Sequence, residues 1–250
     1  MISLTGKRIL VTGGSRGIGR ATALLCARAG ADVGITYHTR RADADKVARE
    51  VRALGRRAYV GGGDLADPAR VRQIFAEVQA AFGGLDGLVA NHGVWPTAEV
   101  SLAQLAPERW RDTMRANLDA VFLTTQAALG LMGAGGRIVM VGSTAGQRGE
   151  AFHADYAATK GAIMSLVKSL AIECAPGITV NCVAPGWVDT EMTAPAFVGD
   201  ARARITQSIP VQRIATPEDI AGPILFLLSD LARHVTGEIL NVNGGSVLCG

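Results

Sequence analysis

The sequence is poor in several features that mark particular classes of protein. Aromatic residues make up only 5% of its 250 residues, and no stretch reaches the ~18 uninterrupted apolar residues that a membrane-spanning helix needs. The 25 Lys and Arg residues are scattered among 22 Asp and Glu residues, without the basic run that indicates nucleic-acid binding. We therefore expect neither a membrane nor a nucleic-acid partner.

Cysteine is also scarce. Cys26, Cys174, Cys182 and Cys249 lie far apart, with no C-x-x-C motif and no histidine at metal-ligand spacing. We interpret them as small core residues in a reducing compartment and expect no metal site. Because the N-terminal residues run into a predicted strand and lack the pattern of a secretory signal, we expect a cytoplasmic protein.

Short apolar runs alternate along the chain with amphipathic stretches, a pattern typical of parallel strands joined by helices. The predicted strands are Arg8–Thr12, Asp32–Tyr37, Arg57–Gly61, Gly87–Ala90, Arg137–Gly142, Thr179–Val183 and Glu238–Val242. The predicted helices are Ile18–Ala29, Ala42–Leu54, Ala69–Phe82, Pro107–Leu131, Asp155–Cys174 and Pro217–Ser229. The sequence thus predicts an α/β fold of Rossmann type, a doubly wound parallel sheet of about seven strands with helices on both faces.

No linker or change in composition divides the chain, so residues 1–250 are predicted to form one domain. The longest stretch without clear periodicity is Trp187–Ile209, which contains Pro195 and several small residues. A loop of this length beside a cleft is usually functional, and we interpret it as a substrate lid.

Tyr156 and Lys160 lie four residues apart in Y-A-A-T-K, so both project from one face of a predicted helix. A free tyrosine titrates near pH ~10, and lowering this pKa by roughly 3 units requires about 4 kcal/mol. A cation about 4 Å away supplies that only where the effective dielectric falls to ~20. Most such pairs are solvated surface pairs, but we predict an acid/base device in a shielded cleft.

The first predicted strand ends in T-G-G-S-R-G-I-G, directly before a helix. Glycines there allow a tight turn and a close approach of the backbone to a pyrophosphate, which the helix N-terminus attracts. The spacing is neither G-x-G-x-x-G nor that of a P-loop, and a simple tight turn is the alternative. The second predicted strand ends without a carboxylate and near Arg40 and Arg41, which favours NADP(H) over NAD(H).

Further motifs follow the predicted strands in order. They are T-G-x-x-x-G-x-G at Thr12–Gly19, Asp64-Leu65, Asn91-x-Gly93, Asn117, Ser143, Tyr156-x-x-x-Lys160, and Asn181 followed by Pro185-Gly186 and Thr190. Across essentially the whole chain this series resembles the short-chain dehydrogenases/reductases.

The resemblance implies an NAD(P)H-dependent oxidoreductase that interconverts a ketone and a secondary alcohol by hydride transfer. Tyr156 would be the general acid/base, and Lys160 would lower its pKa and bind the nicotinamide ribose. Ser143 would hold the substrate oxygen, and Asn117 would support a water-linked proton relay. Taken singly, Ser143 could instead be a turn residue and Asn117 a polar residue inside a helix.

The glycine loop and the resemblance together give a set of predicted cofactor-binding residues. Asp64 would bond the adenine amino group, although it could also cap the following helix. The full set is Gly13, Ser15, Arg16, Gly17, Ile18, Gly19, Tyr37, His38, Thr39, Arg40, Asp64, Leu65, Asn91, Gly93, Tyr156, Lys160, Pro185, Gly186, Val188 and Thr190.

The chain departs from the family pattern after the fourth predicted strand, where A-N-H-G replaces the common N-N-A-G. His92 is then either a structural histidine, which is the more common case, or a contact to cofactor or substrate. The predicted substrate-facing residues are Val94, Trp95, Gln147, Phe152, His153 and Trp187.

Within the family the chain most resembles bacterial 3-oxoacyl-[acyl-carrier-protein] reductases. Those enzymes often carry arginines for an acidic carrier protein in two turns, which here are Gly133–Gly136 and Ala175–Gly177. A small-molecule carbonyl or alcohol substrate is therefore the main expectation, a 3-oxoacyl-[acyl-carrier-protein] reductase the alternative, and a non-catalytic cofactor-binding regulator a remote one. The resemblance also implies a homo-oligomer, a tetramer formed by the helices that carry Asn117 and Tyr156.

Overall fold

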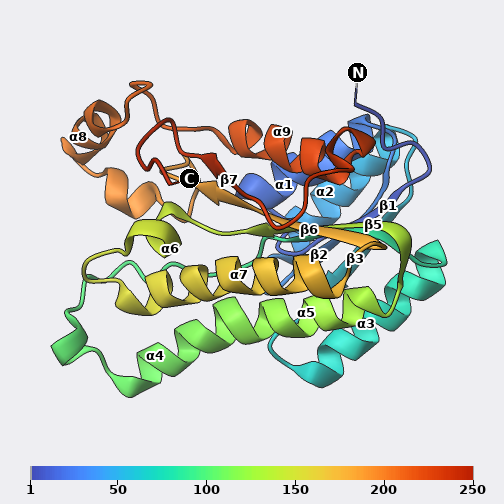
Figure 1. The fold of residues 1–250 in the computed structure, drawn as a ribbon, viewed down its shortest axis with the longest axis horizontal. Helices are drawn as coiled ribbons and strands as arrows, with labels where there is room; N and C mark the ends of the chain where they lie inside the picture. The colour runs from blue at the N-terminus through green and yellow to red at the C-terminus, as the bar shows by residue number, and fades with distance from the viewer. Residues whose placement is uncertain (1, 250) are drawn as a thin grey trace.

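The computed structural model describes residues 2–249, and seven parallel strands form its central sheet in the order β3-β2-β1-β4-β5-β6-β7 (Figure 1). Their bounds are β1 Arg8–Val11, β2 Asp32–Tyr37, β3 Ala58–Gly62, β4 Leu85–Ala90, β5 Met132–Val141, β6 Ile178–Pro185 and β7 Ile239–Val242. All seven predicted strands are confirmed. β5 begins five residues before its predicted start because Leu85 pairs with Met132, ahead of a register shift.

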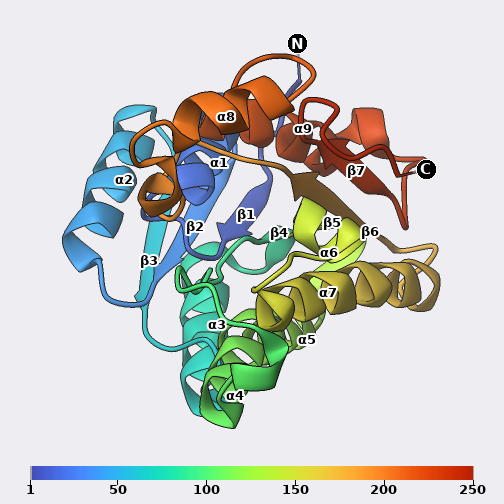
Figure 2. The ribbon, with the colours of Figure 1, turned by 90° about the vertical axis from the view of Figure 1, so that its left-hand side faces the viewer.

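Helices cover both faces of the sheet, so the predicted doubly wound architecture is also confirmed (Figures 1 and 2). One face carries α1 Gly17–Arg28, α2 Arg41–Ala53 and α9 Pro217–Leu228; the other carries α3 Pro68–Phe82, α5 Ala120–Leu129 and α7 Ala154–Glu173.

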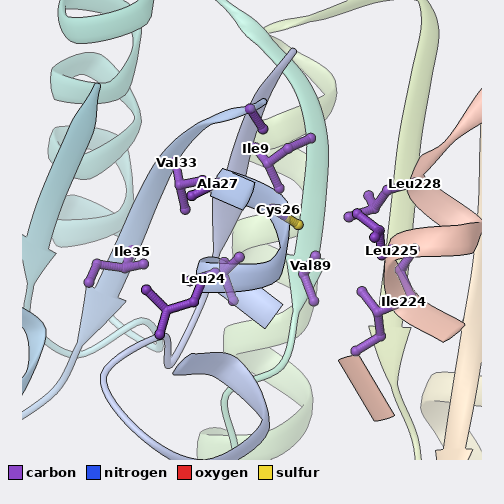
Figure 3. Close-up of a cluster of buried hydrophobic side chains, with 14 of the residues drawn as sticks. Ile9, Leu24, Cys26, Ala27, Val33, Ile35, Val89, Ile224, Leu225 and Leu228 are labelled. Atoms are coloured by element: carbon purple, nitrogen blue, oxygen red, sulfur yellow. The ribbon is translucent and has the colours of Figure 1, made fainter. Parts of the chain in front are cut away.

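Two hydrophobic cores lie on the two faces of the sheet, because alternate strand residues point to opposite sides. Ile9 and Val11 of β1 pack with α1 and α9 in the core drawn in Figure 3, whereas Leu10 packs on the opposite side against α3 and β4. Full burial of each such side chain contributes about 1.5–3 kcal/mol. The strand ends are thereby held rigidly.

The strand order reverses at β1, because the chain builds β2 and β3 on one side of it and β4 to β7 on the other. At such a switch point the connections after β1 and β4 leave in opposite directions and open a crevice at the carboxyl ends of the strands.

The predicted helix Pro107–Leu131 is interrupted. α4 Pro107–Met114 and α5 are joined by a π-helical turn, Arg115–Asp119. The wider turn contains the buried Asn117, whose side chain bonds residues outside the helix. Turns of this kind are rare and frequently mark functional sites.

The Trp187–Ile209 stretch is more regular than predicted. It contains a 3₁₀ turn at Ala194–Phe197 and helix α8, Ala201–Ser208. A second short helix that was not predicted, α6 Thr144–Arg148, follows β5. Both helices are too short for a clear apolar repeat.

Cys26 and Cys182 are buried core residues, as expected, whereas Cys174 is only partly covered. The interpretation is wrong for Cys249, which is exposed near the end of the chain. Among residues 2–249, no helix is both long enough and apolar enough to cross a membrane.

Candidate active site

A cavity of about 550 Å³ opens at the carboxyl ends of the strands, around the switch point. It brings together residues from most of the sequence motifs that follow the strands. Of the predicted residues, those that line it are Gly13, Ser15, Arg16, Gly17, Ile18, Tyr37, His38, Thr39, Arg40, Asp64, Leu65, Asn91, Gly93, Ser143, Tyr156, Lys160, Pro185, Gly186, Val188 and Thr190. Gly19 and Asn117 do not line it.

The glycine loop turns sharply at Gly13 and Gly17, whose φ angles are 65° and 51°. α1 then begins at Gly17, and no side chain in the described part of the chain caps its first turn. The free main-chain N–H groups and the helix dipole together suit an anion. The loop fits a dinucleotide pyrophosphate.

Gly19 packs directly against the glycine loop without lining the cavity. A Cβ at this position would overlap the Gly13 carbonyl oxygen, so glycine lets α1 approach the loop closely. The Asn91 amide donates hydrogen bonds to the carbonyls of Thr12 and Gly13, at 3.0 and 3.2 Å. Asn91 therefore fixes the loop from β4, besides lining the cavity.

At one end of the cavity the guanidinium groups of Arg16 and Arg40 converge on the carboxylate of Glu191, at 2.7 and 3.0 Å. Arg41 points elsewhere and pairs with Asp45 at 3.6 Å. Arg16 and Arg40 thus supply donors that suit a phosphate as well as a carboxylate.

Ser143, Tyr156 and Lys160 come together from the end of β5 and the first turns of α7. Ser143 caps α6, since its Oγ accepts a hydrogen bond from the Ala145 N–H at 3.1 Å. The Lys160 Nζ donates to the Val141 carbonyl at 2.9 Å and lies 5.7 Å from the centre of the Tyr156 ring.

Burial shifts the pKa values of both Tyr156 and Lys160. Burial raises the pKa of Tyr156 to about 12; interaction with the Ser143 hydroxyl lowers it and the Glu150 charge raises it, both by less. Burial also lowers the pKa of Lys160 to about 8. Loss of solvent dominates the pKa of Tyr156, and the Lys160 ammonium is directed at the Val141 carbonyl. That Lys160 lowers the pKa of Tyr156 stays a prediction.

Asn117 lies behind the catalytic candidates. Its Oδ1 accepts from the Val94 N–H at 2.7 Å, and its Nδ2 donates to the Val94 carbonyl at 2.9 Å and to the Thr159 Oγ1 at 3.3 Å. The π-helical turn thus connects the loop after β4 to α7, next to Lys160.

Asp64 does not cap α3, because Asp67 accepts the hydrogen bond from the Ala69 N–H at that helix end. The Asp64 carboxylate instead accepts from the Ala66 N–H at 2.9 Å and pairs with Arg115, an additional cavity residue.

His92 has its Nδ1 2.7 Å from the Thr12 hydroxyl. That hydroxyl also accepts from the main-chain N–H groups of Asn91 and His92, at 3.0 and 3.3 Å, and lies 3.2 Å from the Val89 carbonyl. Burial lowers the pKa of His92 to about 3, and the ring is neutral at pH 7. These contacts agree with a structural histidine that borders the cavity.

Aromatic side chains gather beside the catalytic candidates. Trp95 stacks on His153 with ring centres 5.1 Å apart and meets Trp187 edge to face at 5.9 Å. Phe197, which was not predicted, contacts Trp187 at 5.7 Å. Of the other predicted substrate-facing residues, Val94 lines the cavity, Gln147 donates to the Asn241 side chain at 2.6 Å, and Phe152 is exposed.

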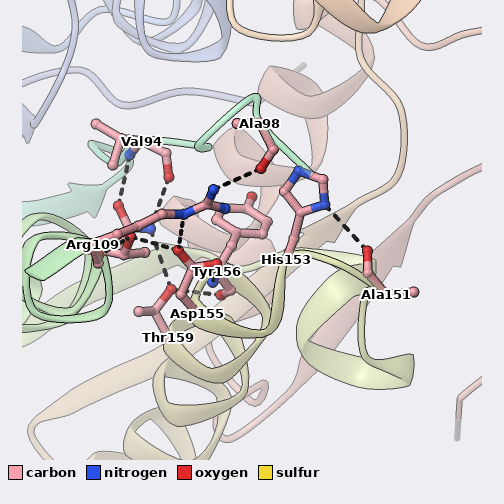
Figure 4. A network of polar contacts seen from close by, with 10 residues as sticks. Val94, Ala98, Arg109, Ala151, His153, Asp155, Tyr156 and Thr159 are labelled. Carbon is pink, nitrogen blue, oxygen red and sulfur yellow. Dashed lines mark hydrogen bonds and ion pairs between the residues drawn. The ribbon is translucent and has the colours of Figure 1, made fainter. Parts of the chain in front are cut away.

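A buried polar network supports this region (Figure 4). Asp155, fully buried beside Tyr156, accepts from Arg109 Nε, Thr113 Oγ1 and the Tyr156 N–H, each at 3.0 Å. Arg109 also donates to the Ala98 carbonyl at 2.8 Å. The network joins α4, α7 and the loop that carries Trp95.

No motif marks Arg109 or Arg115, and neither was predicted; Arg115 lines the cavity and Arg109 pairs with the buried Asp155. Glu191, Met192 and Thr193 also line the cavity and lie in the segment predicted as a lid, although none of the three was predicted individually. They reach the site from helix interiors or from the stretch after β6. Only the fold brings them there.

The fold and cavity define a Rossmann-type α/β protein, and comparisons with known proteins narrow this class. A family model described as enoyl-(acyl carrier protein) reductase matches residues 13–246. The chain is 40% identical over 250 residues to L-rhamnose 1-dehydrogenase (NAD(P)(+)) of Azotobacter vinelandii, covering 97% of each chain. It is 39% identical over 247 residues to 3-oxoacyl-[acyl-carrier-protein] reductase of Escherichia coli, covering 98% of each.

Solved structures agree. A short-chain dehydrogenase from Burkholderia cenocepacia in complex with NADP has a TM-score of 0.91 and 41% identity, covering 97% of this chain and 98% of that one. A short-chain dehydrogenase/reductase from Brucella melitensis has a TM-score of 0.93 and 32% identity, covering 99% of both. The chain belongs to the short-chain dehydrogenase/reductase family. It is an oxidoreductase acting on CH–OH and C=O groups.

Proposed function

We propose that the protein is an NADP(H)-preferring oxidoreductase that interconverts a small ketone and a secondary alcohol, with Tyr156 as general acid/base. The observation that carries this proposal is the convergence of Ser143, Tyr156 and Lys160 with the glycine loop on one cavity. A nicotinamide cofactor suits the uncapped α1 terminus and the paired guanidinium groups of Arg16 and Arg40.

The bound cofactor would supply the hydride. The glycine loop would hold its pyrophosphate, Arg16 and Arg40 its 2′-phosphate, and Lys160 its nicotinamide ribose. In ketone reduction, the Ser143 hydroxyl would hold the substrate oxygen, and the Tyr156 Oη–H would donate the proton that this oxygen needs. The raised pKa of Tyr156 keeps the phenol protonated at neutral pH, so the proton to be donated is present.

Asn117 would act as a positioning residue. It holds both main-chain polar groups of Val94 and bonds Thr159, the neighbour of Lys160. We infer that this arrangement supports a water-linked path by which a proton returns towards Lys160 and Tyr156.

The substrate class has two candidates. The relative named 3-oxoacyl-[acyl-carrier-protein] reductase supports a carrier-bound acyl substrate. The one named L-rhamnose 1-dehydrogenase supports a small polyol or sugar. Trp95, Trp187 and His153 offer a compact aromatic wall. Gly133–Gly136, predicted as a turn but forming the start of β5, and the turn Ala175–Gly177 lack arginines for an acidic carrier protein. We favour the small molecule.

We also propose a cytoplasmic homotetramer. Phe122 on α5 and Ile172 on α7 are 51% and 79% exposed, and both lie on the helices that the family resemblance places at the tetramer interface. Light scattering that gives the 26.0 kDa of one chain would contradict this assembly.

A substrate panel tests the proposed function. Small ketones, secondary alcohols, sugars, quinones and 3-oxoacyl thioesters would each be assayed for a change in NADPH absorbance. We expect turnover of a small ketone or alcohol. Tight NADPH binding without turnover of any member would favour the non-catalytic regulator instead.

A further inference from the structure

Glu191 lies at one end of the cavity, between two arginines from other parts of the chain. Its carboxylate oxygen is 2.7 Å from Arg16 Nη1, in the glycine loop, and 3.0 Å from Arg40 Nη2, after β2. Arg40 has Asp43 as a more distant second partner, at 3.5 Å. One carboxylate therefore bridges the two guanidinium groups that border the cavity here.

The chemistry of this position decides between the two nicotinamide cofactors. A carboxylate near the end of the second strand accepts a hydrogen bond from an adenosine ribose 2′-hydroxyl, whereas arginines accommodate a 2′-phosphate. No carboxylate stands at the end of β2, where the chain reads Tyr37-His38-Thr39-Arg40. Glu191, in the segment after β6, brings one to within 3.0 Å of the Arg40 guanidinium.

We propose that Glu191 is a movable residue that determines cofactor selectivity, an inference that rests on the function proposed above. With NAD(H), the carboxylate stays in place and accepts a hydrogen bond from the ribose 2′-hydroxyl. With NADP(H), the 2′-phosphate binds Arg16 and Arg40 in place of the Glu191 carboxylate, and the Glu191 side chain rotates towards solvent. The protein then uses either cofactor, and the carboxylate lessens its preference for the phosphorylated one.

The surroundings of Glu191 suit this movement. Its side chain is 55% exposed, and exposed ion pairs hold weakly. The backbone on either side is fixed, since Thr193 Oγ1 accepts from the Thr190 N–H at 3.2 Å and donates to the Val188 carbonyl. The side chain can therefore rotate towards solvent while the turn that carries it stays in place.

The test is a Glu191→Gln variant, with dissociation constants for NADPH and NADH measured by fluorescence titration. Removing the charge leaves the arginines free for the phosphate, so NADPH should bind several-fold more tightly. NADH should bind more weakly because the amide is a poorer acceptor. The selectivity ratio should shift towards NADPH by about tenfold.

Asp189→Asn provides the matched control. It removes the same charge two residues away, but Asp189 pairs with Arg202 and does not line the cavity, so the ratio should stay within twofold. Adenosine 2′,5′-bisphosphate and adenosine 5′-phosphate, titrated in the same way, should reproduce the shift without the nicotinamide.

Two results would overturn the role of Glu191 alone: both cofactors bind the wild type and Glu191→Gln leaves their ratio unchanged, or Asp189→Asn shifts the ratio equally. Failure of the wild type to bind either cofactor would overturn the proposed function together with this inference.

Discussion

The ammonium group of Lys160 donates a hydrogen bond to the main-chain carbonyl of Val141, 2.9 Å away at the end of β5. The side chain is only 4% exposed. Burial lowers its pKa from 10.5 to about 8, so keeping Lys160 charged costs free energy in the folded protein.

This cost predicts how stability depends on pH. Between pH 8 and 10.5 the unfolded chain keeps the Lys160 proton that the folded protein has lost, so stability rises with pH. Relative to Lys160→Met, the wild-type free energy of unfolding should increase by about 3 kcal/mol over this window, since one pKa unit corresponds to about 1.4 kcal/mol.

Urea unfolding of both proteins at pH 7, 9 and 10.5 measures the difference. Tyr156 titrates in both proteins, and its contribution cancels to first order. A difference that is constant across this range would show that Lys160 has an ordinary pKa in the folded protein.

Much of the fold follows from the sequence, because strands buried on both faces are short continuous apolar runs. Runs such as Ile9–Val11 and Leu88–Ala90 lie where they were predicted. The π-helical turn could not be predicted, since Arg115–Asp119 continues an ordinary helical sequence. Its wider turn accompanies the bonds that Asn117 makes to Val94, a contact across 23 residues of chain.

Part of the candidate site could also be predicted from the sequence, and part could not. Motifs after strand ends, such as Ser143 and Pro185-Gly186, predict cavity residues because the fold brings all strand ends to one edge. The direction in which the pKa of Tyr156 is shifted could not be predicted, since it depends on how deeply the phenol is buried and on where the Lys160 ammonium points. Glu191 and Arg109 reach their partners over 175 and 46 residues of chain, and no local pattern marks them.

The buried pair of Arg109 and Asp155 should contribute strongly to stability. Burial raises the pKa of Asp155, but hydrogen bonds from Arg109, the Tyr156 N–H and Thr113 outweigh it, so the pKa lies below 3.8. Arg109→Met should cost about 3–5 kcal/mol at pH 7 because it leaves a buried carboxylate uncompensated.

Urea unfolding measures this cost, which should shrink as the pH falls and Asp155 becomes protonated in the variant before it does so in the wild type. Arg111→Met is the control, since its pair with Glu108 is exposed and should contribute less than about 1 kcal/mol. Equal effects of the two substitutions would contradict a special role for the buried pair.

Arg40 should favour NADPH over NADH. Arg40→Gln removes a charge-assisted hydrogen bond worth about 1.5–3 kcal/mol, so the NADPH dissociation constant should rise at least tenfold while that of NADH changes little. Arg41→Gln is matched to it, because Arg41 lies one residue further on and pairs with Asp45. If the two variants weaken NADPH equally, general electrostatic attraction explains the preference.

The most direct test of the account is turnover by a Tyr156→Phe variant, with NADPH affinity measured in parallel. Losing the phenolic proton should lower kcat by about 10²–10⁴-fold, while the NADPH dissociation constant stays within threefold. Tyr59→Phe makes the same chemical change at a hydroxyl that bonds Glu77 outside the cavity, and it should keep its activity. Turnover by Tyr156→Phe within a few-fold of wild type would contradict the assignment of Tyr156 as the acid/base.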